Sequence, residues 1–440
     1  MTATDTPTAG HPVVVVGAGL AGHRLAQQLT LLGEREVVLI SEEPHPPYNR
    51  VLLAEVLAGR YHPGLATLAA LPPGIAHHHS RVVRIDRPHR RVLCDDGAVI
   101  EYGSLVLATG SNPVLPPLRG LFEDPSLRLH TRQYRELPSG VFTFRTMTDC
   151  TDLDARLPQA ERAVVVGGGL LGVSAARALA ARGVQVLLAH QGEHLMEHHL
   201  DHQAAELLRR HLAAQKIEVH TECRVRAVLT DAARTVTGVE LADGFRLDAE
   251  LLVLATGVRP RTGLARAAEL TIRQGVLVDD QLRTSDPRIH ALGDCAEHDG
   301  VVYGLAGPAL EQADVLAQVL SHRAAAYRGS RLLTRLTLNT PHPAEPPLDL
   351  ATFGVPEPTG PQDRVVRLAD GGRGTYRKVI VRRDADGDDR LVGGVLLGDL
   401  DTVGDLAHTW QGDEALTAHP LHLLTTHSTA GTRTLEGTPR

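Results

Sequence analysis

VVVVGAGLAG, at residues 13–22, is the stretch that decides the fold of this chain. The pattern returns as AVVVGGGLLG at residues 163–172. A second stretch, LVLATG at residues 105–110, returns unchanged at residues 252–257. Two segments that recur at nearly one spacing indicate that a structural unit is present twice.

Both copies follow the order strand, glycine turn, helix, strand. In the first copy the apolar residues between 25 and 32 have helical spacing, and a strand follows at residues 37–40. In the second copy residues 173–182 are rich in alanine, and a strand follows at residues 184–189. Strands joined by crossover helices form parallel sheets, so we predict an α/β fold.

Each glycine turn has the spacing G-x-G-x-x-G, follows a strand and opens a helix, which is the context that a dinucleotide-binding site requires. The first glycine allows a tight turn, the second lets a pyrophosphate approach the backbone, and the third allows close packing of the helix. The positive N-terminus of the helix then stabilises the pyrophosphate. We predict two such sites, formed by Gly17, Gly19, Leu20, Ala21 and Gly22 and by Gly167, Gly169, Leu170, Leu171 and Gly172.

An acidic residue at the end of the second strand of such a unit holds the adenosine ribose. In the first copy Glu42 has this position, with Glu43 as the alternative if the strand register differs. In the second copy His190 occupies it, and Glu193 falls in the following loop. A neutral histidine repels a 2′-phosphate less than a carboxylate does, and a protonated one attracts it below a pKa of about 6.5. The second site is therefore expected to take NADH or NADPH.

The rest of the chain follows a different pattern. Residues 276–278 read as a short strand and residues 308–322 as a helix. From Arg331 onward, a proline-rich stretch precedes strands at residues 376–382 and 391–397. We predict that this tail is a separate α+β domain whose last residues, roughly 20, are loosely held.

The composition is that of a globular protein: 440 residues, 42% of them apolar and 22% charged, with a net charge of −7. This charge argues against a broad nucleic-acid-binding surface. The apolar start has no basic region before it and is broken by glycines, so it predicts neither a signal peptide nor a membrane span. The four cysteines have no C-x-x-C spacing, which argues against a disulfide framework or zinc site and favours a cytoplasmic protein with reduced thiols.

Two further features are interpreted as structural. His77, His78 and His79 are consecutive, so their side chains do not easily reach one metal ion, and we expect a solvated loop and no metal site. Cys295 has no visible thiol partner and is expected to be a buried packing residue.

The two glycine turns, the two Ala-Thr-Gly segments and the Gly293-Asp294 pair together resemble the FAD- and pyridine-nucleotide-dependent oxidoreductases with two dinucleotide domains. The resemblance covers about residues 12–325. It implies two Rossmann-like, glutathione-reductase-like domains, with FAD on the first glycine turn and NADH or NADPH on the second. It also implies that Asp294 holds the ribityl chain of FAD, and that Val83, Ala108, Thr109, Gly110 and Gly257 contribute to cofactor binding.

A narrower resemblance extends to about residue 410. Residues 42–53, 297–313, 374–378 and 391–399 are similar to the flavoprotein part of NADH-dependent assimilatory nitrite reductases and to assimilatory nitrate reductase electron-transfer subunits. Disulfide reductases need a redox cysteine pair, and coenzyme A disulfide reductases a cysteine near residues 48–53; this chain has neither. No cysteine follows Cys295 to hold an Fe–S cluster, so we expect a separate acceptor protein, an Fe–S or haem/sirohaem reductase.

The resemblance implies a FAD-binding domain in two parts, residues 1–118 and 266–330, an NAD(P)-binding domain at 119–265 and the C-terminal α+β domain at 331–440. It implies electron transfer from NAD(P)H through FAD in nitrate assimilation, by a cytoplasmic monomer or homodimer without a membrane or nucleic-acid partner. This chemistry needs no acid–base pair, so we name no catalytic residue. Arg50 is expected either beside the flavin, where its charge would stabilise the reduced form, or at the surface or a phosphate.

Two alternatives stay open. In the first, the chain is an enzyme whose electron acceptor is a rubredoxin or a ferredoxin, or O₂ as in an NADH oxidase. In the second, the chain is a flavin- or nucleotide-binding regulatory protein without turnover. Residues Phe122–Pro138 look like an insertion, to which the sequence assigns no function.

Overall fold

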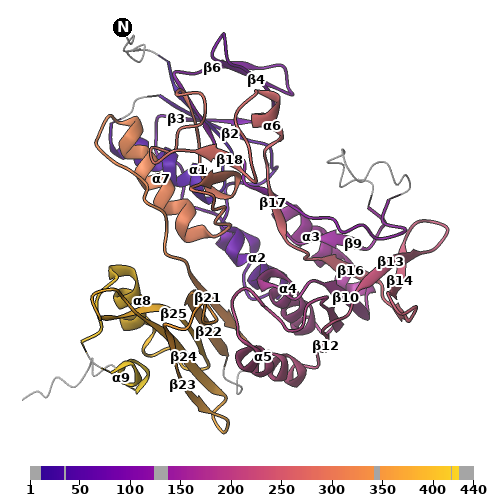
Figure 1. Cartoon of the computed structure of the whole chain (residues 1–440). Coiled ribbons are helices and arrows are strands. Elements are labelled where there is room, and N and C mark those ends of the chain that lie inside the picture. The colour runs from indigo at the N-terminus through magenta and orange to yellow at the C-terminus, as the bar shows by residue number, and fades with distance from the viewer. Residues whose placement is uncertain (1–10, 34–35, 123–136, 341–346, 418, 426–440) are drawn as a thin grey trace, which may run out of the picture. The chain divides into compact units, whose positions relative to one another are not determined.

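The structure is a computed structural model, and it describes residues 11–33, 36–122, 137–340, 347–417 and 419–425 (Figure 1). The chain divides into two compact units. The first unit comprises Met1–Ala189 and Cys223–Ser330, and the second comprises His190–Glu222 and Arg331–Arg440. Most of the expected insertion, residues 123–136, and the end of the tail, residues 426–440, lie outside the described residues.

A parallel five-stranded sheet forms the first half of the first unit. Its order is β19-β7-β1-β2-β3, so the strand before the first glycine turn lies in the middle. Helix α1 buries Leu25, Ala26 and Leu29, as their helical spacing predicts, and α7 packs beside it. The elements are β1 (Val13–Val16), α1 (Leu20–Leu31), β2 (Val37–Ser41), β3 (Ile75–His79), β7 (Ser104–Leu107), β19 (Ile289–Ala291) and α7 (Ala306–Leu320).

A second parallel sheet repeats this arrangement within the same unit. The strands that this unit contributes to the sheet run β11-β10-β16-β9, with the strand before the second glycine turn again between its two partners. The duplicated strand–turn–helix–strand unit predicted from the sequence is therefore present. The elements are β9 (Val141–Thr143), α3 (Met147–Arg156), β10 (Arg162–Val166), α4 (Leu170–Ala181), β11 (Gln185–Ala189) and β16 (Leu251–Leu254).

Two short strands, β8 (Ser111–Pro113) and β17 (Val258–Pro260), connect the halves of the first unit. Each follows one of the Ala-Thr-Gly segments, and they pair in antiparallel fashion, with Ser111 opposite Pro260. The remaining elements are β4 (Val82–Asp86), β5 (Arg91–Cys94) and β6 (Val99–Glu101) in one antiparallel sheet; β13 (Val225–Thr230), β14 (Val236–Leu241) and β15 (Arg246–Asp248) in another; β18 (Val276–Val278) beside β20 (Ala296–His298); the helices α2 (Leu53–Leu57) and α6 (Gly263–Ala267); and the 3₁₀ turns Arg50–Leu52, Pro63–Ala66, Leu157–Gln159 and Gly293–Cys295.

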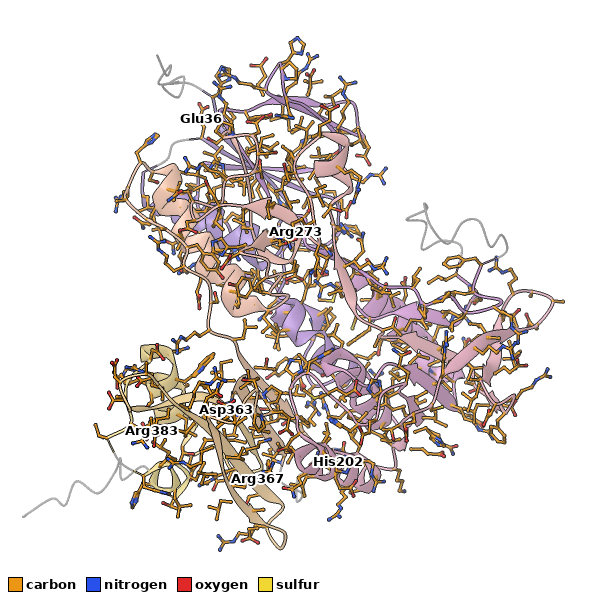
Figure 2. The ribbon with its side chains drawn as sticks, viewed as in Figure 1. Glu36, His202, Arg273, Asp363, Arg367 and Arg383 are labelled. Carbon is orange, nitrogen blue, oxygen red and sulfur yellow. The ribbon has the colours of Figure 1, made fainter. Side chains whose placement is uncertain are left out.

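The second unit is built on an antiparallel five-stranded sheet in the order β21-β22-β25-β24-β23, as expected for an α+β domain. Trp410 of α8 and Leu424 of α9 complete its apolar core. Its edge strand β23 carries exposed polar side chains such as Arg367 (Figure 2). The elements are α5 (His202–Ala214), β12 (Glu218–His220), β21 (Leu333–Leu338), β22 (Leu348–Gly354), β23 (Asp363–Asp370), β24 (Thr375–Arg383), β25 (Asp389–Leu397), α8 (Val403–Gly412) and α9 (Pro420–Thr425).

Residues 190–222, which the sequence assigns to the NAD(P)-binding segment, group with this sheet. Asp201 caps the N-terminus of α5, and its carboxylate accepts hydrogen bonds from Lys378 Nζ at 2.8 Å and from the Tyr376 hydroxyl. Lys378 is fully buried, so this contact fixes α5 to the sheet. The expected segment boundaries at residues 118, 265 and 330 stay a prediction.

No helix in the described part of the chain has the length and apolar character needed to cross a membrane.

Candidate cofactor-binding sites

Both glycine turns have a backbone that a side chain would disrupt. Gly17 has a φ of +113° and Gly167 one of +114°, a conformation that other residues rarely adopt. A Cβ atom on Gly17 would collide with the carbonyl group of Ala108, and one on Gly167 with that of Ala255. These alanines belong to the two Ala-Thr-Gly segments, which explains why the two sequence motifs recur together.

The third glycines allow the close helix packing that the motif predicts. A Cβ atom on Gly22 or Gly172 would collide with the carbonyl oxygen of Gly17 or Gly167 in its own turn. The other residues predicted for the turns, Leu20, Ala21, Leu170 and Leu171, form the first helical turns of α1 and α4.

The middle glycines, Gly19 and Gly169, face open space instead. No heavy atom lies within 4 Å of the position that a Cβ atom would take on either of them. They are the N-cap residues of α1 and α4; neither cap has a side-chain hydrogen bond, and neither first turn contains an acidic residue. An anion can therefore approach the N–H groups of both helix N-termini.

The threonines of the Ala-Thr-Gly segments tie the two halves together. Thr109 donates to the carbonyl of Arg261 at 3.1 Å, and Thr256 donates to the carbonyl of Val114 at 2.7 Å. Gly110 and Gly257 both have a positive φ, at +71° and +98°, where the chain turns into β8 and β17. These segments therefore position the glycine turns and the crossing between the halves.

Asp294 lies on the 3₁₀ turn Gly293–Cys295. Its carboxylate accepts hydrogen bonds from Ser111 Oγ at 2.9 Å and from Arg145, which also donates to Ser111 at 2.6 Å. The Nε atom of Arg145 is buried and has no hydrogen-bond partner among the described residues. Asp294 thus belongs to a polar group with an unused donor, and a buried donor of this kind normally has an acceptor.

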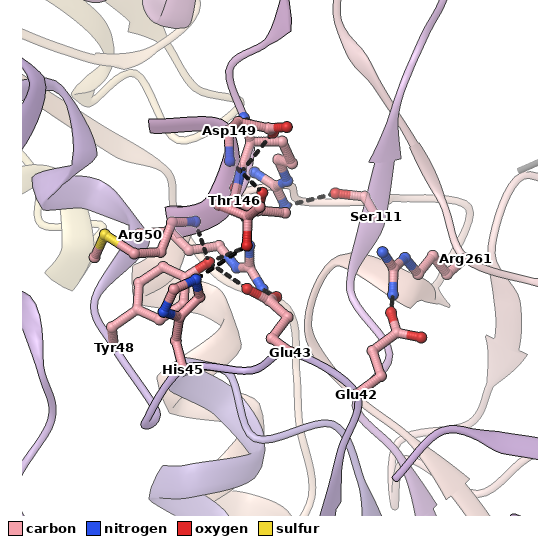
Figure 3. Close-up of polar contacts among 12 residues, drawn as sticks. Glu42, Glu43, His45, Tyr48, Arg50, Ser111, Thr146, Asp149 and Arg261 are labelled. Carbon is pink, nitrogen blue, oxygen red and sulfur yellow. Dashed lines mark hydrogen bonds and ion pairs between the residues drawn. The ribbon is translucent and has the colours of Figure 1, made fainter. Parts of the chain in front are cut away.

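Glu42 is the first residue after β2, as the expected ribose position requires. Its carboxylate accepts a hydrogen bond from Arg261 (Figure 3). Arg261 also donates to Asn112. Glu43 points to a different set of partners, Tyr48 and Arg50. The ribose position at Glu42, with Glu43 as the alternative, stays a prediction.

Glu43, Tyr48 and Arg50 form a largely buried polar triad (Figure 3). The Tyr48 hydroxyl donates to Glu43 at 2.6 Å and accepts from Arg50 at 2.9 Å, while Arg50 also donates to Glu43. Arg50 reaches the carbonyl of Arg145 at 2.9 Å, and the N–H of Met147 donates to Tyr48 at 2.9 Å. The triad therefore joins the segment after β2 to the beginning of α3.

Burial disfavours the charged forms of Glu43 and Arg50, and the ion pair between them outweighs this effect. Burial alone would raise the pKa of Glu43, but the charge of Arg50 and the hydrogen bonds from Tyr48 and Arg50 hold that pKa below its usual range. Burial would lower the pKa of Arg50, and the Glu43 carboxylate raises it instead. Burial and the Glu43 carboxylate also raise the pKa of Tyr48. Arg50 is therefore a cation held in a fixed position.

A buried ion pair links the helix of the second glycine turn to the first half of the unit. Arg177, in α4, is 1% exposed and donates to Glu55 of α2 at 2.7 Å. Glu55 also accepts a hydrogen bond from Arg60. Since α4 begins at the second glycine turn, this pair restricts how that turn lies relative to the first half.

The remaining two predicted residues are Val83 and His190. Val83 is on β4, in an antiparallel sheet, with 49% of its surface exposed. His190 follows β11 and belongs to the second unit, where its ring lies 3.7 Å from Glu197. Burial lowers the pKa of His190, so its protonation begins at a lower pH than the ordinary histidine value predicts.

The expectation of a loop at residues 77–79 is wrong. These histidines lie on β3, which pairs with β2 in parallel register, His77 opposite Leu39 and His78 opposite Ile40. The strand β3 lies at the edge of the sheet, and it tolerates consecutive polar residues because His77 and His79 are exposed and His78 is only partly buried. Cys295, in contrast, is fully buried as predicted, and its thiol donates to the carbonyl of Leu107.

The sequence profile described as pyridine nucleotide-disulphide oxidoreductase matches residues 11–315, a range that contains both glycine turns and Asp294. The chain belongs to the pyridine nucleotide-disulphide oxidoreductase family. The resemblance stated from the motifs is thereby confirmed.

Two similar proteins come from Bacillus subtilis (strain 168). Nitrite reductase NAD(P)H is 32% identical over 395 residues, which are 88% of this chain and 45% of that protein. The assimilatory nitrate reductase electron transfer subunit is 31% identical over 395 residues, which are 88% of this chain and 47% of that protein. This chain therefore spans just under half the length of these curated relatives.

A solved structure supports the fold of this family member. The ferredoxin reductase for the CYP199A2 system from Rhodopseudomonas palustris is 25% identical, with a TM-score of 0.77 over 92% of this chain and 96% of that chain. The predicted α/β fold class with two Rossmann-like domains is confirmed.

All four cysteines of this family member are free, so its thiols form no disulphide.

Three side chains of these polar groups are absent from the sequence-based prediction: Ser111, Arg145 and Arg261. Ser111 directly follows the repeated LVLATG stretch and Arg261 lies four residues after its second copy, so their position was a usable signal. Arg145 carries no such signal, because both of its side-chain partners are distant in the chain.

Proposed function

We propose that the chain is an FAD-dependent NAD(P)H oxidoreductase, which passes electrons from NAD(P)H through FAD to a separate redox protein, an assimilatory nitrite or nitrate reductase. The duplicated glycine turn carries this proposal. Gly19 and Gly169 each present open space at an uncapped helix N-terminus, as a bound pyrophosphate requires. The two Bacillus subtilis relatives support the class of acceptor.

The residues of the first turn fit FAD. Gly19 is open to its pyrophosphate, and the buried Nε of Arg145, next to Asp294, offers a donor without a partner among the described residues. Asp294 and Glu42 would accept hydrogen bonds from the ribityl and ribose hydroxyls. FAD, when bound, supplies the capacity to accept a hydride and to release electrons to a second acceptor.

Arg50 supplies a fixed positive charge near this site. The Asp294 carboxylate is among the charges that raise the pKa of Arg50, so the triad and Asp294 share one electrostatic environment. A preorganised cation stabilises negative charge that develops on a bound group. We therefore assign to Arg50 the stabilisation of the reduced cofactor, not a proton transfer.

The ion pair between Arg177 and Glu55 would contribute by holding the two nucleotide sites in a fixed arrangement. Hydride transfer requires the donor and acceptor atoms to lie about 3–3.5 Å apart and aligned. The buried pair holds α4, and with it the second glycine turn, against α2 of the first half. We propose that it restricts the relative movement of the two nucleotide sites.

The acceptor is tested by reoxidation kinetics. The protein, reduced with one equivalent of NADH, would be mixed in a stopped-flow instrument with a sirohaem nitrite reductase domain, a rubredoxin, a ferredoxin or O₂. The proposal expects the fastest reoxidation with the sirohaem protein. A faster reaction with ferredoxin would instead support the second candidate, a ferredoxin or rubredoxin reductase, which the similarity to the Rhodopseudomonas palustris enzyme favours.

A further inference from the structure

His78, Cys94 and Asp96 come together on the first unit, away from the groups described above. His78 lies on β3, Cys94 ends β5, and Asp96 lies in the turn that follows. One ligand atom from each, an imidazole nitrogen, a thiol sulfur and a carboxylate oxygen, all lie within 4.8 Å of one another. The cluster joins an edge strand of the parallel sheet to the antiparallel sheet of β4, β5 and β6.

His78 and Asp96 lie in direct contact. The buried Nε2 atom of His78 lies 2.9 Å from Asp96 Oδ2, which is an ion pair when the imidazole is protonated. At that distance a proton or a metal ion lies between the nitrogen and the carboxylate oxygen, because a bare lone pair and a carboxylate repel each other. The thiol of Cys94, which is 5% exposed, adds a third electron-rich atom to the same place.

The types of ligand atom in this cluster indicate which cation it would bind. Nitrogen, sulfur and oxygen ligands together suit zinc and neighbouring divalent transition metals, whereas magnesium and calcium prefer oxygen ligands alone. Zinc bonds of about 2.0–2.3 Å in a tetrahedron place the ligand atoms roughly 3.5 Å apart. Small side-chain rotations would bring atoms now within 4.8 Å to that spacing. Asp96 and His78 are partly exposed, which leaves a fourth position for water.

We propose that His78, Cys94 and Asp96 bind one divalent transition-metal ion, with zinc(II) as the fitting ion, and that this ion clamps β3 to the end of β5. The Cys94 thiol gives up its proton to the solvent when the metal–sulfur bond forms, so the affinity should fall as the pH falls. No change of oxidation state is involved.

The test uses the whole purified protein after treatment with a chelator. Equilibrium dialysis against zinc chloride measures stoichiometry, and cobalt(II) reports coordination through its tetrahedral absorption bands and a cobalt–thiolate band. We expect one tight ion per chain and protection of Cys94 from a thiol reagent. His78→Gln and Asp96→Asn should each weaken binding by about tenfold or more, and Cys94→Ser should remove the cobalt–thiolate band.

Matched control variants are available nearby. His79→Gln changes the adjacent histidine of β3, and Cys223→Ser changes a partly exposed thiol outside the cluster; both should bind as the wild type does. The proposal is overturned if the wild type binds no stoichiometric ion, or if His78→Gln leaves the affinity unchanged. Because Cys94 is buried, circular dichroism checks the fold of its variant, and His78→Gln decides the question if Cys94→Ser does not fold.

Discussion

The guanidinium group of Arg145 is hydrogen-bonded to the carboxylate of Asp294, a residue 149 positions later in the chain. Arg145 lies just before α3, whereas Asp294 lies on the 3₁₀ turn that follows β19. The contact therefore links the segment between β9 and α3, in the half built on the second parallel sheet, to the turn after β19, in the half built on the first. It also places a charged donor beside the residue assigned to the ribityl chain of FAD.

Asp294→Ala should weaken FAD retention. The change removes a hydrogen-bond acceptor from the cofactor, and bonds to charged groups contribute about 1.5–3 kcal/mol each. The expected loss of FAD affinity is on the order of 10- to 100-fold, measured by dialysis and flavin fluorescence. The control is Asp314→Ala, which breaks the exposed ion pair between Asp314 and Arg24. Unchanged FAD affinity in the Asp294 variant would contradict the assignment.

Glu55→Gln should destabilise the first unit and slow its reduction by NADH. Breaking a buried ion pair costs about 3–5 kcal/mol, because the buried Arg177 loses a charged partner. Urea unfolding measures stability, and single-turnover reduction measures whether the two nucleotide sites are still positioned. Arg177→Met combined with Glu55→Leu should recover stability but not the reduction rate. If the double variant is reduced at the wild-type rate, the pair has no positioning role.

His290 should make the first unit less stable in mild acid. Burial lowers its pKa to about 4 in the folded chain, against about 6.5 when unfolded. Between these values the unfolded state binds more protons, so stability falls as the pH falls from about 6.5 to about 4, by at most about 3 kcal/mol. His290→Gln should lose this part of the pH dependence in urea unfolding. Parallel pH profiles for the wild type and the variant would show that His290 contributes nothing.

His190 is expected to set the preference between NADH and NADPH. Because burial lowers its pKa, the ratio of kcat/KM for the two cofactors should stay flat from pH 8 to about 6.5 and shift toward NADPH only below that. His190→Glu should raise the NADH/NADPH ratio at least about tenfold, through repulsion of the 2′-phosphate. His198→Gln, at an exposed neighbouring position, is the control. A ratio indifferent to His190→Glu would mean that this side chain does not face the ribose.

The duplicated core could be predicted from the sequence because its signals are local. Residues 13–22 and 163–172 specify strand, turn and helix within one short stretch, and α1 begins at Leu20 as its pattern requires. The glycine positions follow from backbone constraints that act within the turn and on the adjacent Ala-Thr-Gly segment. Those constraints leave few alternatives for the fold or for the nucleotide sites.

The polar groups around these sites could not be predicted, because they depend on contacts between distant segments. The sequence offers Glu43 only as a register alternative to Glu42, whereas the structure pairs Glu43 with Arg50 and Tyr48. The sequence places His78 only beside its two histidine neighbours, whereas Cys94 and Asp96 approach it from β5 and the turn that follows. A single sequence gives spacing along the chain, and these pairings arise from the tertiary fold.

Anaerobic titration of the purified protein with NADH tests the central proposal most directly. The proposal expects a yellow protein with one non-covalent FAD per chain, whose oxidised flavin absorption is bleached by about one equivalent of NADH or NADPH and returns when an acceptor protein is added. A colourless protein would contradict the assignment of the first glycine turn to FAD. A yellow protein that neither NADH nor NADPH bleaches would contradict the oxidoreductase and favour a nucleotide-binding protein without turnover.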